Sequence, residues 1–443
     1  MTLATSVLAG AKDRVLPPSI PFRYFGAAVL FHPVVWLLVL IGAPETVSFV
    51  GGAGISLAAL HILTLGMLAA TAMGAALQLL PVATRQAIPA RWPARLAFWL
   101  LVPGTLMTVH GMATATTWAM ALGGAMAALA LAMLGVLIAL NLMRARDLGL
   151  VAAHGQVAIA SLFGLLALGL LLVFNFAHGF LPDHRAIALV HVIVAGYGFM
   201  GMFVVGFSQI LVPMFALAAS PDRGLGRAGL WLAVLGLGLG VAGVLGAVDG
   251  LVVAAIVSGL AASAAHLTAM ARVMRNRMRK RLGLSFVLIR AAWGLLPLSL
   301  VIGLLQHLEL LGERGGTLFV FVLFAGWLLT MLLGILQRIL PFLATMHPTG
   351  DGGRMPTLSQ LTAEGPLKVS TACHLLALLV SAVGIIAGQA LVLRLGAGFG
   401  LVGALAFALF AAPIFWRLIR GRARTRPGTP PGPARPPETQ TSG

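Results

Sequence analysis

The chain has 443 residues, of which 60% are hydrophobic and only 9% are charged. A soluble protein needs about a quarter of its residues charged to cover its surface, so this composition excludes a soluble multidomain protein. The net charge of +18 does not indicate a nucleic-acid partner, because the basic residues cluster beside apolar segments, where they set membrane topology or contact anionic lipid. A single cysteine, Cys373, excludes a disulfide framework and any cysteine-based zinc or iron–sulfur site.

Apolar segments long enough to cross a lipid bilayer account for most of the chain. In chain order, we predict twelve transmembrane helices over residues 25–43, 50–81, 96–115, 117–143, 156–178, 187–218, 228–247, 251–274, 284–310, 317–345, 369–395 and 398–419. Residues 1–24 are expected to form an N-terminal segment without a cleavable signal peptide, and residues 421–443 a disordered, basic, proline-rich tail. The predicted fold class is an all-α polytopic membrane protein.

The distribution of positive charge predicts how these helices are oriented. Of the 29 Lys and Arg residues, only Arg185, Arg314 and Arg394 fall in the odd-numbered loops. We therefore expect the even-numbered loops and both termini to lie in the cytoplasm, with the protein in a bacterial inner membrane.

Three of the predicted helices share a motif of glycine, glycine, glutamine and proline, which indicates an internal repeat. The three copies are Gly66, Gly74, Gln78 and Pro81; Gly196, Gly206, Gln209 and Pro213; and Gly326, Gly334, Gln337 and Pro341. The first glycines are spaced 130 residues apart, and glutamine occurs only nine times in the chain, which makes chance a poor explanation. We predict three pseudo-symmetric four-helix units, over about 25–147, 156–281 and 284–420, whose glycines permit close helix–helix approach.

Histidines are the main chemical candidates within the spans. His61 and His191 occupy equivalent repeat positions, five residues before the first glycine, where the third copy has Phe321. A rise of about 1.5 Å per residue places both histidines near the outer face of the hydrocarbon layer. Buried polar side chains in membranes are often functional, although a histidine near an interface is also an ordinary anchor.

His110 forms a second candidate group with Met107 and Met112 on the same predicted helix. Imidazole and thioether groups are donors that suit copper. Methionine is also a routine packing residue, so the spacing alone leaves a structural role open.

Twelve helices, three four-helix units, and histidines on the second and sixth helices resemble the catalytic subunit I of the haem-copper oxidase superfamily. The local sequences ALHILTLG, LVHVIVAGYG and QRILPF are similar to divergent subunit-I-like membrane proteins and, more distantly, to the NnrS family of haem- and copper-containing proteins linked to nitric oxide. The resemblance implies that His61 would be an axial ligand of a low-spin haem. It implies that His191 would bind the copper of the oxygen-reducing site.

The full ligand set of that superfamily is missing from this sequence. The family requires a histidine pair on the tenth helix and further copper ligands around the seventh, and residues 317–345 and 228–247 contain no histidine. We therefore do not expect a complete terminal oxidase.

A smaller cofactor site remains as the expected function. The resemblance allows a haem held by His61 with His110, His191 or a methionine, or by one ligand with an open distal face. It also allows copper held by His61, His191 and the group of Met107, His110 and Met112. Either site would be open to a periplasmic electron donor or copper carrier, and would serve redox chemistry, a nitric-oxide response or respiratory cofactor handling. The alternatives are a transporter of a small solute or metal ion and a cofactor-free scaffold subunit.

Overall fold

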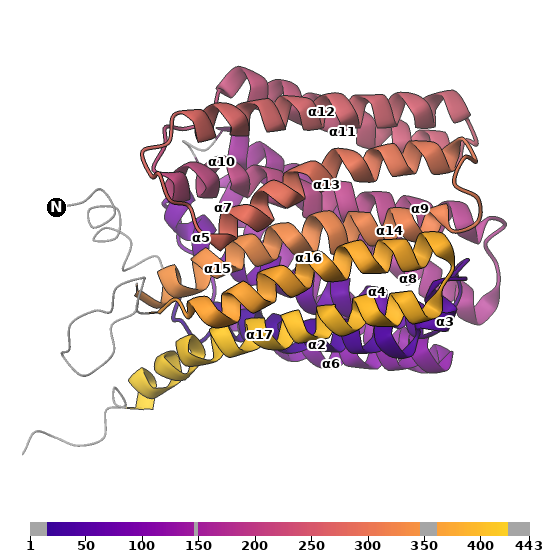
Figure 1. The fold of residues 1–443 in the computed structure, drawn as a ribbon, viewed down its shortest axis with the longest axis horizontal. Coiled ribbons are helices and arrows are strands. Elements are labelled where there is room, and N and C mark those ends of the chain that lie inside the picture. The colour runs from indigo at the N-terminus through magenta and orange to yellow at the C-terminus, as the bar shows by residue number, and fades with distance from the viewer. Residues whose placement is uncertain (1–15, 146–148, 346–360, 424–443) are drawn as a thin grey trace, which may run out of the picture.

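The computed structural model describes residues 16–145, 149–345 and 361–423. Over these ranges the chain is helical and contains no strand, and twelve helices are long and apolar enough to cross a membrane. These spans are α2 (Pro21–Ile41), α4–η1–α5 (Ile55–Thr84), α6 (Trp92–Thr114), α7 (Thr117–Met143), α8 (Gly149–His178), α9–η2–α10 (His184–Ala216), α11 (Arg223–Leu245), α12 (Asp249–Arg275), α13 (Leu284–His307), α14–η3–α15 (Gly315–Thr345), α16 (Glu364–Ala387) and α17 (Ala390–Ala423). The prediction of a twelve-helix membrane protein is confirmed, and Figure 1 shows the helices running side by side in one bundle.

Some predicted boundaries differ from those of the structure. Helix α8 begins at Gly149 rather than at residue 156, so it contains His154. Helix α17 continues to Ala423, three residues into the predicted tail, because basic residues near a helix C-terminus interact favourably with the helix dipole and do not end the helix. The rest of that tail and most of the predicted N-terminal segment lie outside the described residues.

The second, sixth and tenth spans are not continuous α-helices, contrary to expectation. Each contains eight residues of π-helix: η1 (Ile62–Ala69), η2 (Val194–Gly201) and η3 (Val322–Leu329). Each π-helix holds the first glycine of its repeat motif. Segments of π-helix are rare and occur often at functional sites.

The division into three four-helix units stays a prediction, but the closest helix packing falls at corresponding places in the three units. Each unit ends in a closely packed hairpin: α6 with α7, α11 with α12, and α16 with α17. At the same place in each hairpin, a Cβ added to a glycine would meet a backbone nitrogen nine residues further along the chain: Gly111 with Met120 (2.5 Å), Gly243 with Val252 (2.8 Å) and Gly384 with Leu393 (2.6 Å). This glycine spacing is a second repeat signal, beside the motif of glycine, glycine, glutamine and proline.

The second glycine of each repeat motif packs against the first helix of its own unit. A Cβ at Gly74 would lie 3.2 Å from a backbone oxygen of α2, one at Gly206 would lie 2.8 Å from the His154 side chain of α8, and one at Gly334 would lie 2.9 Å from a backbone oxygen of α13. The predicted close approach is confirmed at these positions. At the first glycines, contact is tight for Gly66 and Gly196 but ordinary for Gly326, whose nearest neighbour is 3.5 Å away.

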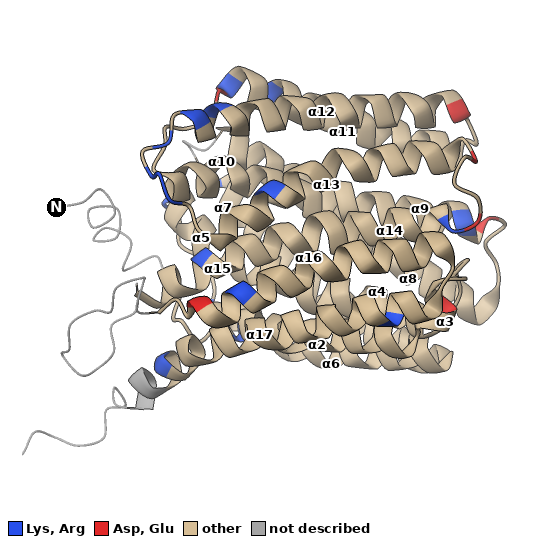
Figure 2. Cartoon of the chain, viewed as in Figure 1, with Lys and Arg blue, Asp and Glu red and all other residues tan. Residues whose placement is uncertain are grey.

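Charged side chains gather at the two ends of the bundle. In Figure 2, Lys and Arg lie mainly at the end that carries the loop between α12 and α13, here called the basic end, and Asp and Glu lie mainly at the opposite end. The rings of Phe22 on α2 and Phe415 on α17 are 6.0 Å apart, so the start of α2 and the later part of α17 share the basic end. Which side of the membrane this end faces stays a prediction.

Polar capping fixes one helix start at the basic end. Asp222 precedes α11, and its carboxylate accepts a hydrogen bond from the backbone N–H of Leu225 at 2.9 Å. This hydrogen bond, together with the nearby Arg272, holds the pKa of the Asp222 carboxyl below its usual value.

Candidate functional site

The structure brings His61 and His191 together. The centroids of their rings are 6.4 Å apart and their planes are inclined by 26°. His61 lies in the second turn of the span that begins at Ile55, and His191 lies in the third turn of the span that begins at His184, so both are near the end opposite the basic end. The two equivalent repeat positions therefore place two imidazoles within reach of one small ligand.

The polar contacts of His61 determine which of its nitrogens is free. Its Nδ1 lies 3.0 Å from the carbonyl oxygen of Leu57, and a carbonyl only accepts, so Nδ1 carries the hydrogen. The Nε2 atom of His61 then keeps a lone pair for a metal ion, an arrangement typical of metal-binding histidines.

His191 has a different environment. Its Nδ1 is buried and has no well-formed hydrogen bond among the described residues, although the Leu165 backbone faces the ring. A Cβ added to Gly169 of α8 would lie 3.1 Å from the Cε1 of His191, so this glycine leaves the space in which the imidazole sits.

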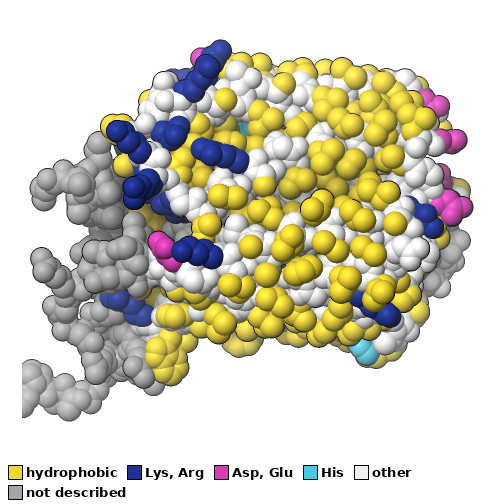
Figure 3. All heavy atoms as spheres, in the orientation of Figure 1, with side chains coloured by type: hydrophobic (Ala, Val, Ile, Leu, Met, Phe, Trp, Pro, Cys, Tyr) yellow, Lys and Arg dark blue, Asp and Glu magenta, His cyan; other side chains and the backbone are white. Residues whose placement is uncertain are grey.

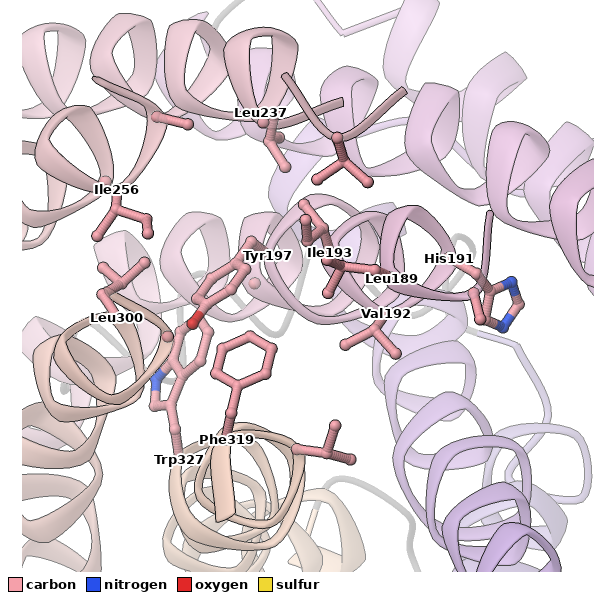
Figure 4. Close-up of a pocket in the computed structure, with 18 of the residues that line it drawn as sticks. Leu189, His191, Val192, Ile193, Tyr197, Leu237, Ile256, Leu300, Phe319 and Trp327 are labelled. Atoms are coloured by element: carbon pink, nitrogen blue, oxygen red, sulfur yellow. The ribbon is translucent and has the colours of Figure 1, made fainter. Parts of the chain in front are cut away.

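The imidazole pair lies where two cavities meet. A cavity of about 120 Å³ is bounded by η1, α6, α7, α8 and η2, and a larger one of about 1150 Å³ lies between α8, the α9–η2–α10 span, the α11–α12 hairpin, α13 and α14. Both cavities are lined by His61, His191 and Met112. Figure 4 shows part of the larger cavity, with His191 at the far edge from Tyr197, Phe319 and Trp327.

Only one member of the predicted Met107, His110 and Met112 group reaches this place. Met112 is 4% exposed and lines both cavities, whereas the His110 side chain is exposed and Met107 is half-buried, and these two residues line neither of the two cavities. Residues two positions apart on an α-helix point about 200° apart, so His110 and Met112 cannot face the same site. The structure does not bring His110 and Met107 to the imidazole pair.

The third repeat supplies no imidazole to the pair from the described residues. The equivalent position in the third repeat is Phe321, and over the described parts of the chain no group of three or more His, Cys, Asp or Glu side chains is arranged to hold a metal ion. Tyr197 is engaged elsewhere, because its hydroxyl lies 2.8 Å from Ser299 and its ring stacks on Trp327.

Two further histidines line the larger cavity and were not among the predicted site residues. These are His154 on α8 and His266 on α12, which line the half of the cavity nearer the basic end, as Gln209 on α10 also does. His154 was missed because the predicted helix began after it. Gln209 could have been found from the sequence, because it is the glutamine of the second repeat motif.

Two other buried histidines, His32 and His374, line neither of these two cavities and each make one side-chain hydrogen bond. His32 accepts a hydrogen bond from the Trp36 indole at 3.3 Å, and His374 is hydrogen-bonded to Thr330 at 2.8 Å. These contacts tie α2 internally and join α16 to α15, which agrees with a structural role for His32.

Comparison with known proteins gives the class of this fold. No protein-family model matches the sequence, and no curated protein matches it significantly. Among solved structures, the fold is similar to that of a haem-copper terminal oxidase whose dimer was determined by cryo-EM, with a TM-score of 0.59 and 12% sequence identity over 93% of this chain and 85% of that chain. The protein is thus a membrane protein with the fold of haem-copper oxidase subunit I, and the more distant likeness to the NnrS family stays a prediction.

Proposed function

We propose that this subunit-I-like protein binds one metal centre between His61 and His191, in redox chemistry, a nitric-oxide response or respiratory cofactor handling. The observation that carries the proposal is the 6.4 Å separation of the two ring centroids. One metal ion bonded to a nitrogen of each ring at about 2.0 Å would set those nitrogens about 4 Å apart, and the two rings, whose planes are inclined by 26°, would turn their nitrogens toward the ion. Such an ion would supply one-electron chemistry.

Copper is the metal that the surrounding donors favour. The Met112 thioether lines the same space as both imidazoles, and a soft thioether with two imidazoles suits Cu(I). Haem iron is the second candidate, because both histidines also line the cavity of about 1150 Å³, which offers room beside them for a large ring.

The residues present do not fit the complete haem-copper centre of an oxidase. The tenth span offers Phe321 where the other two copies have histidine, and the seventh span, α11, contains no histidine. We therefore propose a single metal site and no reduction of oxygen to water.

Metal analysis of the purified protein tests this function. We expect copper or iron bound near one per chain, with a Soret band if the iron is in haem, and loss of the metal in His61→Ala and in His191→Ala. The His110→Ala variant is the matched control, since His110 is exposed and lies outside both cavities. A wild-type protein without either metal after loading, or unchanged metal in both variants, would contradict the proposal and favour a transporter or a scaffold subunit.

A further inference from the structure

Arg290 is an arginine within a membrane span whose side chain lies on the outer surface of the bundle. It follows Leu284, the first residue of α13, by six residues, which corresponds to about 9 Å along the helix. The side chain is exposed and has no hydrogen bond or ion pair with any of the described residues. A cation inside the membrane is costly unless an anion lies beside it, so Arg290 calls for an anion from outside the chain.

Two other arginines within spans at the basic end have partners in the protein. Arg23 on α2 lies over the ring of Phe98, with 5.3 Å from its Cζ to the ring centroid. Arg338 on α15 donates a hydrogen bond to the Ser285 hydroxyl at 2.8 Å. The exposed arginine of α13 differs from both, because the protein offers it neither an aromatic face nor an acceptor.

The acidic side chains at the basic end are already paired. Of those in the described ranges, Asp222 lies 3.6 Å from Arg272 and Glu364 lies 3.8 Å from Lys368. Residues 275–281, which connect α12 to α13, add five Lys or Arg residues and no acidic one. The surroundings of the α13 arginine therefore carry an excess of positive charge that favours a negatively charged partner.

An apolar stripe continues from Arg290 on the same face of α13. Val287, Leu298 and Val301 are 47%, 44% and 38% exposed, and a Cβ added to Gly294 would meet no atom within 4 Å, so this glycine leaves a shallow recess. The eleven residues from Arg290 to Val301 span about 16 Å, close to half the hydrocarbon thickness of a bilayer. Figure 3 shows this face of the molecule as mostly hydrophobic, with Lys and Arg gathered near the basic end. The stripe is therefore about as long as one lipid acyl chain.

We infer that α13 binds a phospholipid of net negative charge, with the lipid phosphate on Arg290 and one acyl chain along the stripe. A phosphodiester offers two oxygens to which a guanidinium donates in parallel, and an arginine about 9 Å inside its helix can extend to the headgroup level. The basic connection over residues 275–281 repels the cationic headgroup of a zwitterionic lipid, so a net negative charge is favoured.

This lipid site is separate from the metal site. The residues of α13 that line the larger cavity, among them Leu296 and Leu300, lie on another face of the helix from the stripe. The inference therefore goes beyond the proposed metal centre and does not rest on it.

The test is native mass spectrometry of the full-length protein, delipidated in detergent. The probes are dioleoyl phosphatidylglycerol and dioleoyl phosphatidylcholine, which have the same chains and differ in headgroup charge. We expect the wild type to bind phosphatidylglycerol at least about tenfold more tightly, and Arg290→Gln to lose most of this preference. The matched control is Arg95→Gln, which removes the same charge from an exposed position near the start of α6 and should keep the preference.

A second variant covers the case in which Arg290→Gln does not fold. Arg290→Lys keeps the positive charge but not the two parallel N–H groups, and it should bind phosphatidylglycerol about threefold or more weakly than the wild type does. Circular dichroism checks the fold of each variant.

Three results would each overturn the inference. These are equal affinity of the wild type for the two lipids, the same lipid preference in Arg290→Gln and Arg95→Gln, and complete displacement of phosphatidylglycerol by soluble glycerol phosphate at equal concentration. The last result would identify a site for a free anion in place of a lipid. None of these results depends on the metal content at His61 and His191.

Discussion

Gly169 controls the space around the His191 ring. A side chain at this position would begin 3.1 Å from the imidazole, whereas Gly164 on the same helix has no atom within 4 Å of an added Cβ. The lack of a side chain is therefore needed for packing at Gly169 and is not needed at Gly164. Changes to the residues around a metal ligand typically lower metal affinity by about tenfold to a hundredfold.

We expect Gly169→Val to weaken metal binding at the imidazole pair by about tenfold or more, because the new side chain displaces the His191 ring. The measurement is metal occupancy against added Cu(I), with Gly164→Val as the control. Equal occupancy in the two variants would show that the position of His191 does not depend on Gly169.

Helix hairpins at the ends of the three units depend on glycines that face backbone atoms. An added Cβ at Gly384 in α16 would lie 2.6 Å from the Leu393 nitrogen and 2.9 Å from its Cα, and backbone atoms cannot move aside as a flexible side chain can. The three π-helices are a second feature at this scale, since each changes the helical register in the middle of a central span.

The Gly384→Ala variant should be less stable than the wild type by about 1–3 kcal/mol, because the hairpin of α16 and α17 must separate to accept the methyl group. Gly398→Ala in α17 meets no atom within 4 Å and gains the same helix propensity, so it should be neutral or slightly stabilising. The measurement is the Tm of thermal unfolding in detergent for the Gly384→Ala and Gly398→Ala variants. Matching Tm values for the two variants would mean that the hairpin opens without cost.

At the scale of the whole molecule, charged side chains lie at the two ends and apolar side chains cover the flanks, as in a protein that spans a membrane (Figure 2 and Figure 3). Large apolar side chains are exposed along its flanks, among them Leu379 on α16 and Leu409 on α17, and the face in Figure 3 is mostly hydrophobic between its charged ends. The orientation of this body in the membrane follows from the rule that cytoplasmic loops carry the Lys and Arg excess.

Cysteine labelling measures that orientation. Gln389→Cys, in the exposed turn between α16 and α17, should react with a membrane-impermeant maleimide in intact spheroplasts, whereas Asn276→Cys at the basic end should react only after permeabilisation. The native Cys373 lies within α16 and provides the background. The reverse labelling pattern would place the basic end outside the cell.

The sequence by itself determined the twelve spans, the all-α class and the threefold motif, because span length, charge distribution and glycine spacing are local or periodic properties of the chain. It also indicated His61 and His191 as an equivalent pair. Only the tertiary structure decided that their rings meet, that Met112 joins them while His110 faces outward, and that His154, Gln209 and His266 share a cavity. The physical reason is that side chains from different helices meet only if each helix is rotated correctly about its own axis. The π-helices and the packing against distant helices set this rotation, and the periodicity of the sequence does not reveal it.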